Sequence, residues 1–84
     1  MILSWTDDAW DDYEYWQKTS KTQIKQINKL IKAIKREPFE GIGRPEQLKH
    51  ELAGYWSRRI DQEHRLVYEV QDDAIVIVQC RLHY

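Results

Sequence analysis

The sequence predicts a small α+β domain, in which two N-terminal helices pack on a largely antiparallel four-stranded sheet in the order βααβββ. Two observations lead to this fold class. Apolar residues recur at helical spacing from Ile24 to Ile34, and three later runs rich in β-branched and aromatic residues are separated by connectors of hairpin length. With 84 residues the chain has room for one domain, spanning residues 1–84.

The first half of the chain reads as a strand followed by two helices. "MILSW" is short and apolar, and Thr6 after it is a good N-cap for a helix from about Asp7 to Lys18. Trp5 and Trp10 have the spacing of a hydrophobic staple. Ser20 and Gln23 form a capping-box pattern for the second helix, which we expect to end before Pro38.

The second half reads as a loop, a short helical turn and three strands. "PFEGIGRPE" holds both prolines and two of the three glycines, which predicts a loop. "EQLKHEL" predicts a short turn with Glu46 in its first residues. The strands are expected in "YWSRRI", "HRLVYEV" and "AIVIVQCRL", joined by "DQE" and "DD".

Composition indicates a cytoplasmic protein. The single Cys excludes an internal disulfide, which is typical of a reducing compartment. No apolar stretch approaches the roughly 20 residues that cross a bilayer. The start "MILSWTDD" lacks the features of a signal peptide, so we expect no membrane association.

Charge is segregated along the chain although the net charge is only -1. Residues 1–20 carry -4, residues 21–36 carry +6 and the remainder carries -3. This pattern favours one surface for a polyanion, while solvated helix faces explain it about as well. The basic side of the second helix holds Lys25, Lys29, Lys32 and Arg36.

Alternation along the strands predicts a cationic sheet face. In the last strand it directs Val76, Val78, Cys80 and Leu82 to the core, and it collects Arg59, Arg65, Arg81 and His83 on the other face. Arg58 breaks the pattern, and we expect it to extend to an edge of the sheet. Guanidinium groups on one face repel one another unless something anionic binds among them.

These residue types suit cleavage of RNA through its own 2′-hydroxyl. A base removes the 2′ proton, a cation stabilises the phosphoryl oxygens and an acid protonates the leaving 5′ oxygen. His83 suits the role of the acid because imidazole titrates near neutral pH, whereas His50 and His64, which adjoin turns, are weaker candidates. No H-x-x-x-H or C-x-x-C spacing occurs, so we expect neither a metal nor another cofactor.

The stretch "GIGRPEQLKHELAGYWSRRIDQEHRLVYEV" followed by "CRLHY" closely resembles the YoeB family, ribosome-dependent mRNA interferases of the RelE superfamily that act as toxins of type II toxin-antitoxin systems. The resemblance extends over the whole chain, including "WDDYEYWQ" and "PFEG". One departure is Leu82, where the family has an aromatic residue. The resemblance implies a RelE-like fold and metal-independent endoribonuclease activity that inhibits translation.

By position, the resemblance implies a role for each site residue. Glu46 matches the general base, Arg65 the arginine that stabilises the phosphate and His83 the general acid. Tyr84 matches the aromatic residue that orients the substrate. The cations expected to bind substrate are Lys49, Arg59 and Arg81. Without the family, Glu46 is explained as an acid at a helix start and Arg65 as an exposed strand residue in a salt bridge. We expect strand pairing to hold "RLHY" in place.

The resemblance also implies partners: a YefM-like antitoxin with an acidic C-terminal tail, the ribosome and its mRNA. The basic second helix fits either ribosomal RNA or the antitoxin tail, and the sequence does not choose between them. A homodimer stays open. Two alternatives remain for the function: a ParE-like toxin that binds gyrase, and an inactive RNA-binding module of the same fold.

Overall fold

The computed structural model describes residues 1–83, and Tyr84 lies outside the described residues. Two helices and five strands form an α+β fold, as predicted, with one strand more than predicted. The elements in chain order are β1 (Ile2–Trp5), α1 (Asp7–Thr19), α2 (Lys21–Arg36), β2 (Glu46–Gln47), the 3₁₀ helix η1 (His50–Leu52), β3 (Tyr55–Arg59), β4 (Arg65–Gln71) and β5 (Ala74–Gln79).

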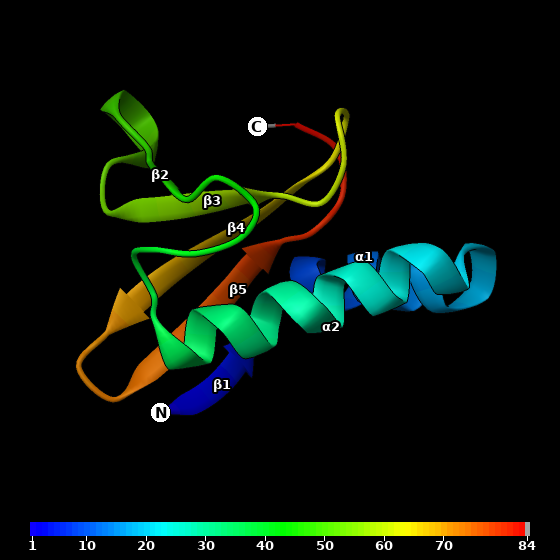
Figure 1. The fold of residues 1–84 in the computed structure, drawn as a ribbon, viewed down its shortest axis with the longest axis horizontal. Helices are drawn as coiled ribbons and strands as arrows, with labels where there is room; N and C mark the ends of the chain where they lie inside the picture. The colour runs from blue at the N-terminus through cyan, green and yellow to red at the C-terminus, as the bar shows by residue number, and fades with distance from the viewer. Residues whose placement is uncertain (84) are drawn as a thin grey trace.

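The sheet has the strand order β1-β5-β4-β3-β2 (Figure 1). β5, β4, β3 and β2 pair antiparallel in succession, and β1 pairs parallel with β5. The strand missing from the sequence prediction is β2, at the edge opposite β1. Glu46 therefore lies in a strand and does not begin a short helix; the helical turn follows at His50.

Both long helices begin at the predicted caps. The Thr6 hydroxyl accepts a hydrogen bond from the Ala9 N–H at 3.1 Å, and the Ser20 hydroxyl accepts one from the Gln23 N–H at 3.2 Å. The Trp5 and Trp10 rings meet edge to face with centroids 5.6 Å apart, as the staple predicted. No helix in the part of the chain that the structure describes is long and apolar enough to cross a membrane.

The core lies between the helices and one sheet face. It includes Ile27, Leu30 and Ile34 of α2 together with Leu66 and Tyr68 of β4. Its β5 members, Ile75 and Ile77, differ from the predicted Val76 and Val78, whereas Cys80, just after β5, faces the core as predicted.

A bulge in β5 explains this difference. Gln79 pairs with Val67 and Ile77 pairs with Tyr68, so Val78 is an extra residue opposite two consecutive residues of β4. A bulge of one residue reverses the alternation beyond it. Cys80 therefore faces the core although Val76 and Val78 are only half-buried. Leu82, predicted to face the core, is 53% exposed.

Arg58 is fully buried and does not extend to an edge, contrary to prediction. Its guanidinium donates to the carbonyls of Ile42, Glu37 and Glu40 and, from Nε, to the Tyr68 hydroxyl at 3.1 Å. The alternation did place this side chain on the core side. Hydrogen bonds to these four acceptors offset the cost of burying the charge, and they attach the loop after α2 to the sheet.

Candidate active site

The sheet register brings three of the predicted site residues to one face. Glu46 pairs with Ser57, and Arg59 pairs with Arg65. Directly paired residues point to the same side of a sheet, as do residues two apart in one strand, so Glu46, Arg59 and Arg65 share a face. This face is the one away from the core, because Arg58 and Leu66, which alternate with these residues, are core residues.

Arg65 is buried and held by its own turn. Only 8% of its surface is exposed, so the alternative explanation of Arg65 as an exposed strand residue in a salt bridge does not hold. Its Nη1 donates to the carbonyls of Asp61, Gln62 and His64 at 3.0, 3.2 and 3.2 Å. Within residues 1–83 these are the hydrogen bonds of the guanidinium, and they leave Nε and Nη2 for another acceptor.

The turn that supports Arg65 is organised by Asp61. One carboxylate oxygen accepts from the backbone N–H groups of Glu63 and His64 at 2.8 and 2.7 Å, and the other accepts from the Gln23 amide of α2. Burial alone would raise the pKa of Asp61, but these hydrogen bonds outweigh burial and lower it. The carboxylate therefore stays ionised and fixes the carbonyls that hold Arg65.

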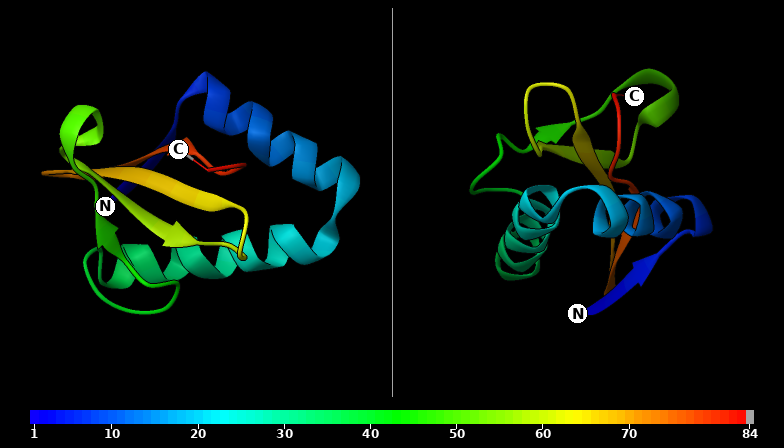
Figure 2. Two further views of the ribbon diagram at one scale, coloured as in Figure 1. Left: turned by 90° about the horizontal axis from the view of Figure 1, so that it is seen from above. Right: turned by 90° about the vertical axis from the view of Figure 1, so that its right-hand side faces the viewer.

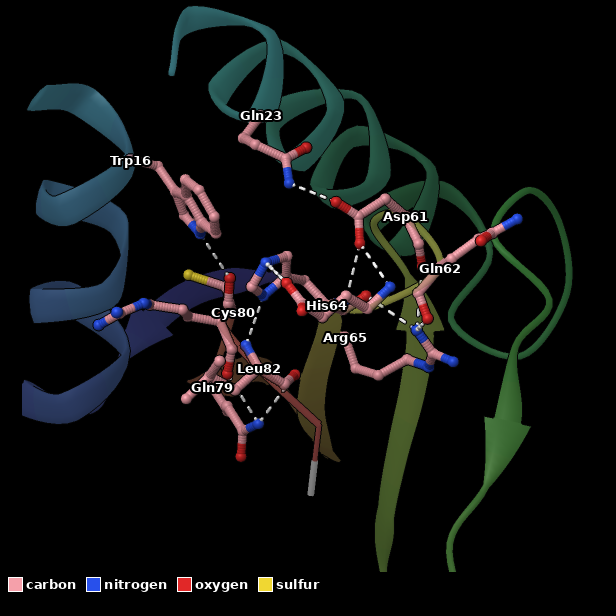
Figure 3. A network of polar contacts seen from close by, with 11 residues as sticks. Trp16, Gln23, Asp61, Gln62, His64, Arg65, Gln79, Cys80 and Leu82 are labelled. Carbon is pink, nitrogen blue, oxygen red and sulfur yellow. Dashed lines mark hydrogen bonds and ion pairs between the residues drawn. The ribbon is translucent and has the colours of Figure 1, made fainter. Parts of the chain in front are cut away.

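The C-terminal segment, residues 80–83, passes beside Arg65 (Figure 3). Strand pairing ends at Gln79, so the prediction that it holds "RLHY" is wrong for residues 81–83, and Tyr84 lies outside the described residues. The Cys80 carbonyl accepts from Trp16 Nε1 at 2.8 Å, and its N–H donates to Asp12 at 3.1 Å. The N–H of Arg65 donates to the Leu82 carbonyl at 3.0 Å. His83, which is exposed, therefore follows directly from a residue bonded to Arg65.

His64 completes this arrangement, and sequence reasoning underestimated it. Its ring is buried against Trp16 with centroids 4.8 Å apart, and its Nδ1 accepts from the Leu82 N–H at 2.7 Å. The position beside a turn gave no sign of this contact, which joins residues 18 apart.

Glu46 and Lys49 belong to one surface hollow. Both are exposed, and with Gln47, Leu48 and His50 they line a space of about 510 Å³ at the β2 edge. The segment 46–54 and the C-terminal segment lie on the same side of the sheet, opposite α2 (Figure 2, right). Glu46 and His83 thus come from two different chain segments.

Arg81 does not join the other arginines. Its guanidinium lies over the Tyr15 ring, 3.8 Å from the centroid, on the side of α1. With His83 and three α1 acids it lines another hollow of about 510 Å³; those acids are Asp8, Asp11 and Asp12. Burial raises the pKa of Asp12, although the Cys80 N–H and the Arg81 charge act in the opposite direction.

A hollow of about 710 Å³, larger than the two beside the predicted site residues, lies elsewhere, at the β1 edge. Trp5, Trp10 and Tyr13 line it together with Lys25, Lys29 and Lys32 of α2. The sheet order places β1 and β2 at opposite edges, so this hollow is remote from Glu46. The basic side of α2, including Arg36, is exposed as predicted and forms a separate cationic surface.

The face thus combines the Glu46 carboxylate with the Arg65 guanidinium, and the exposed His83 follows Leu82, whose carbonyl is bonded to the N–H of Arg65. A group of this kind can move protons and stabilise a phosphoryl oxygen without a metal. Among residues 1–83 no cluster of His, Cys, Asp and Glu has the geometry to hold a metal ion. Tyr84, predicted to orient the substrate, lies outside the described residues.

Comparisons with known proteins agree with this architecture. A family model described as the YoeB-like toxin of bacterial type II toxin-antitoxin systems matches residues 5–84. Toxin YoeB of Escherichia coli K12 is 60% identical over 84 residues, which cover 100% of both chains. A structure described as a YoeB/ParE toxin from Agrobacterium tumefaciens is 52% identical with a TM-score of 0.98, and the match covers 100% of both chains.

Two related structures come from Staphylococcus aureus. One is a YoeB dimer, with a TM-score of 0.93, and the other is a heterotetrameric YoeB-YefM toxin-antitoxin complex, with a TM-score of 0.92. Each matching chain is 48% identical, and each match covers 100% of this chain and 98% of the other. A family match over residues 5–84 and 60% identity over the whole chain fix the relationship. The chain belongs to the family of YoeB-like toxins of bacterial type II toxin-antitoxin systems.

Proposed function

We propose that this protein is an endoribonuclease that cuts mRNA on the ribosome, without a metal, through the 2′-hydroxyl of the RNA. Glu46 acts as the general base on that hydroxyl. Arg65 stabilises the phosphoryl oxygens, and His83 protonates the departing 5′ oxygen. Tyr84 orients the substrate, and Lys49 and Arg59 add positive charge. Arg81 has a lesser part, because Tyr15 already holds its guanidinium.

The observation that carries the proposal is the environment of Arg65. Three carbonyls fix one end of its guanidinium, which leaves Nε and Nη2 to donate to a phosphate. Its backbone N–H holds the segment that bears His83. One residue therefore supplies the cation and orders the proposed acid, which is the preorganisation that a charged transition state requires.

The shape of the face supports a role for the ribosome. Glu46, Lys49 and His83 are exposed, and the hollows beside them are open to solvent and small. A face of this kind offers little contact with which to align a flexible single strand. A ribosome that presents mRNA in a fixed geometry supplies the alignment instead. We therefore expect the protein to act in the cytoplasm, where ribosomes lie.

The proposed partners follow from the same family. We expect a YefM-like antitoxin to neutralise the protein, as the complex from Staphylococcus aureus suggests, and we expect dimers like the related YoeB dimer. The exposed basic side of α2 suits either the acidic antitoxin tail or ribosomal RNA. Binding to the antitoxin tail and binding to ribosomal RNA can each be measured over a range of salt concentrations, with wild type and with Lys25 and Lys29 changed to Ala. The salt dependence of the affinity then distinguishes the two partners.

The test is single-turnover cleavage of a short mRNA on purified ribosomes at saturating protein. Glu46→Gln and His83→Gln should each slow cleavage by a factor of roughly 10² to 10⁴, the usual contribution of a positioned acid or base. Glu40→Gln, which neutralises an exposed carboxylate in the loop after α2, is the matched control and should cut at the wild-type rate. Undiminished cleavage by both site variants would refute the assignment. No cleavage by the wild type would leave the gyrase-binding and RNA-binding alternatives.

A further inference from the structure

We propose that His64 is a positioning residue for the proposed reaction, because its Nδ1 holds the backbone N–H of Leu82 and so directs the neighbouring His83. The inference rests on the proposed function for its effect on rate. The contact itself is a property of the fold and can be tested without any cleavage.

Two consecutive residues grip both polar groups of the Leu82 backbone (Figure 3). His64 accepts from the Leu82 N–H at 2.7 Å, and the N–H of Arg65 donates to the Leu82 carbonyl at 3.0 Å. These contacts fix the peptide planes on both sides of Leu82. The plane that follows Leu82 is the one from which His83 extends.

Leu82 needs these contacts because neither its backbone conformation nor the burial of its side chain is favourable by itself. Its φ is 65°, in the left-handed region that costs a residue with a side chain about 1 kcal/mol or more. Its side chain is 53% exposed, so burial does not hold it. A residue stays in such a conformation only where its surroundings determine it. Without the His64 contact, Leu82 should relax and redirect His83.

The His64 ring is itself well fixed. The Trp16 ring meets it edge to face at an interplanar angle of 82°, and the same indole donates to the Cys80 carbonyl. Because Nδ1 accepts a hydrogen bond, it carries no proton, and the ring proton belongs to Nε2. Nε2 lies 2.9 Å from a carboxylate oxygen of Glu63, to which it donates. The structure thus assigns one tautomer to a neutral His64.

The expected consequence is a loss of rate without a loss of binding. A general acid must reach the leaving oxygen within hydrogen-bond distance, and a misplacement of about 1 Å can lower the rate about 10²-fold. His64 is buried and does not meet the ribosome or the RNA directly. Its removal should therefore lower the saturating single-turnover rate and leave the affinity for ribosomes unchanged.

Two variants separate the hydrogen bond from the packing of the ring. His64→Phe keeps a ring against Trp16 and removes the acceptor. His64→Asn loses the ring but can place its amide oxygen near the position of Nδ1. We expect the Phe variant to cut roughly tenfold to 10²-fold more slowly than wild type. The Asn variant should recover most of that loss, and both should bind ribosomes within about twofold of wild type.

Nuclear magnetic resonance of the free protein gives the second readout. The Leu82 amide should exchange its hydrogen roughly tenfold faster in the Phe variant than in wild type, which corresponds to the net worth of one hydrogen bond. In wild type, the ¹⁵N signals of His64 should show a bare Nδ1 and a protonated Nε2. If His64→Phe does not fold, His64→Gln replaces it, because its amide reaches the Nε2 position and not that of Nδ1.

The outcomes distinguish this proposal from the proposed function. If the wild type does not cut RNA, the proposed function fails, and the exchange rate of Leu82 still decides whether His64 holds the segment. Equal Leu82 exchange in wild type and the Phe variant would overturn the positioning role. Cleavage by His64→Asn as slow as that by His64→Phe would also overturn the positioning role, because the His64 ring would then contribute only through its packing.

Discussion

Among single truncations of charged side chains, Arg58→Ala should destabilise this protein the most. Arg58 is fully buried, and its four acceptors are the Tyr68 hydroxyl and three carbonyls of the loop between residues 37 and 42. Truncation removes every donor at once and leaves a space beneath the loop. The loop then loses its side-chain attachment to β3 and keeps the backbone hydrogen bond from the Arg59 N–H to the Gly43 carbonyl.

The expected magnitude follows from the contacts. Hydrogen bonds to a charged group contribute about 1.5–3 kcal/mol each, which sets an upper limit for the four together. The freed carbonyls can gain water as the loop moves outward, so we expect a loss of about 3–5 kcal/mol in the free energy of unfolding. Proteins of 84 residues have about 4–13 kcal/mol in total, so Arg58→Ala should approach the limit of stability.

Urea denaturation followed by tryptophan fluorescence measures this loss. Arg59→Ala is the matched control, because Arg59 is the next residue of the same strand but is exposed, and it should change stability by less than about 0.5 kcal/mol. Arg58→Met keeps most of the volume and removes the donors, so it should also be destabilised. An Arg58→Met variant as stable as wild type would refute the reasoning, because the desolvation of the guanidinium would then cancel its hydrogen bonds.

Three further results are expected. Gly43 and Gly54 both have positive φ, but a Cβ on Gly43 would lie 2.7 Å from Leu30 Cδ2, whereas one on Gly54 meets nothing within 4 Å. In urea denaturation, Gly43→Ala should therefore lose about 1–3 kcal/mol more of the free energy of unfolding than Gly54→Ala. Equal losses would contradict this packing. The pKa of Asp61 is lowered, so its contribution to stability is full above the unfolded pKa of 3.8 and is lost as the pH falls through the folded pKa. The stability advantage of wild type over Asp61→Asn should therefore shrink on acidification. An advantage that stays constant with pH would argue against this role of Asp61. Burial, with a smaller effect of the Asp12 charge, raises the pKa of the Cys80 thiol to about 12, so a thiol reagent at about pH 8 should modify it only when the protein opens; rapid modification of native protein would show that the thiol is accessible.

The helices were predictable because their signals are local. Thr6 and Ser20 precede the helices they cap, and Pro38 follows the end of α2, so each boundary depends on residues within one or two turns. β2 was missed because two residues carry no periodicity, and its existence depends on pairing with β3. The bulge at Val78 is likewise a property of the β4–β5 pair and not of either strand alone.

The residues of the candidate site likewise divide into those that could be predicted from the sequence and those whose roles depend on distant partners. Alternation and residue type pointed to Arg65 and His83, whereas Glu46 was predicted only from the resemblance to the family; the register brings Glu46 and Arg65 to one face. The roles of Arg58 and His64 depend on partners far along the chain, namely the loop carbonyls and the Leu82 N–H. Alternation placed Arg58 on the core side correctly, but only the loop explains why a charge is tolerated there.

The ends of the RNA test the central claim most directly. If Glu46, Arg65 and His83 cleave through the 2′-hydroxyl, that oxygen bonds to phosphorus and the 5′ oxygen leaves. The RNA fragments released on ribosomes should then carry a 2′,3′-cyclic or 3′ phosphate on the upstream piece and a 5′-hydroxyl on the downstream piece, which mass spectrometry and selective end labelling distinguish. A 3′-hydroxyl paired with a 5′-phosphate would mean that water attacks in place of the 2′ oxygen and would contradict the proposed mechanism.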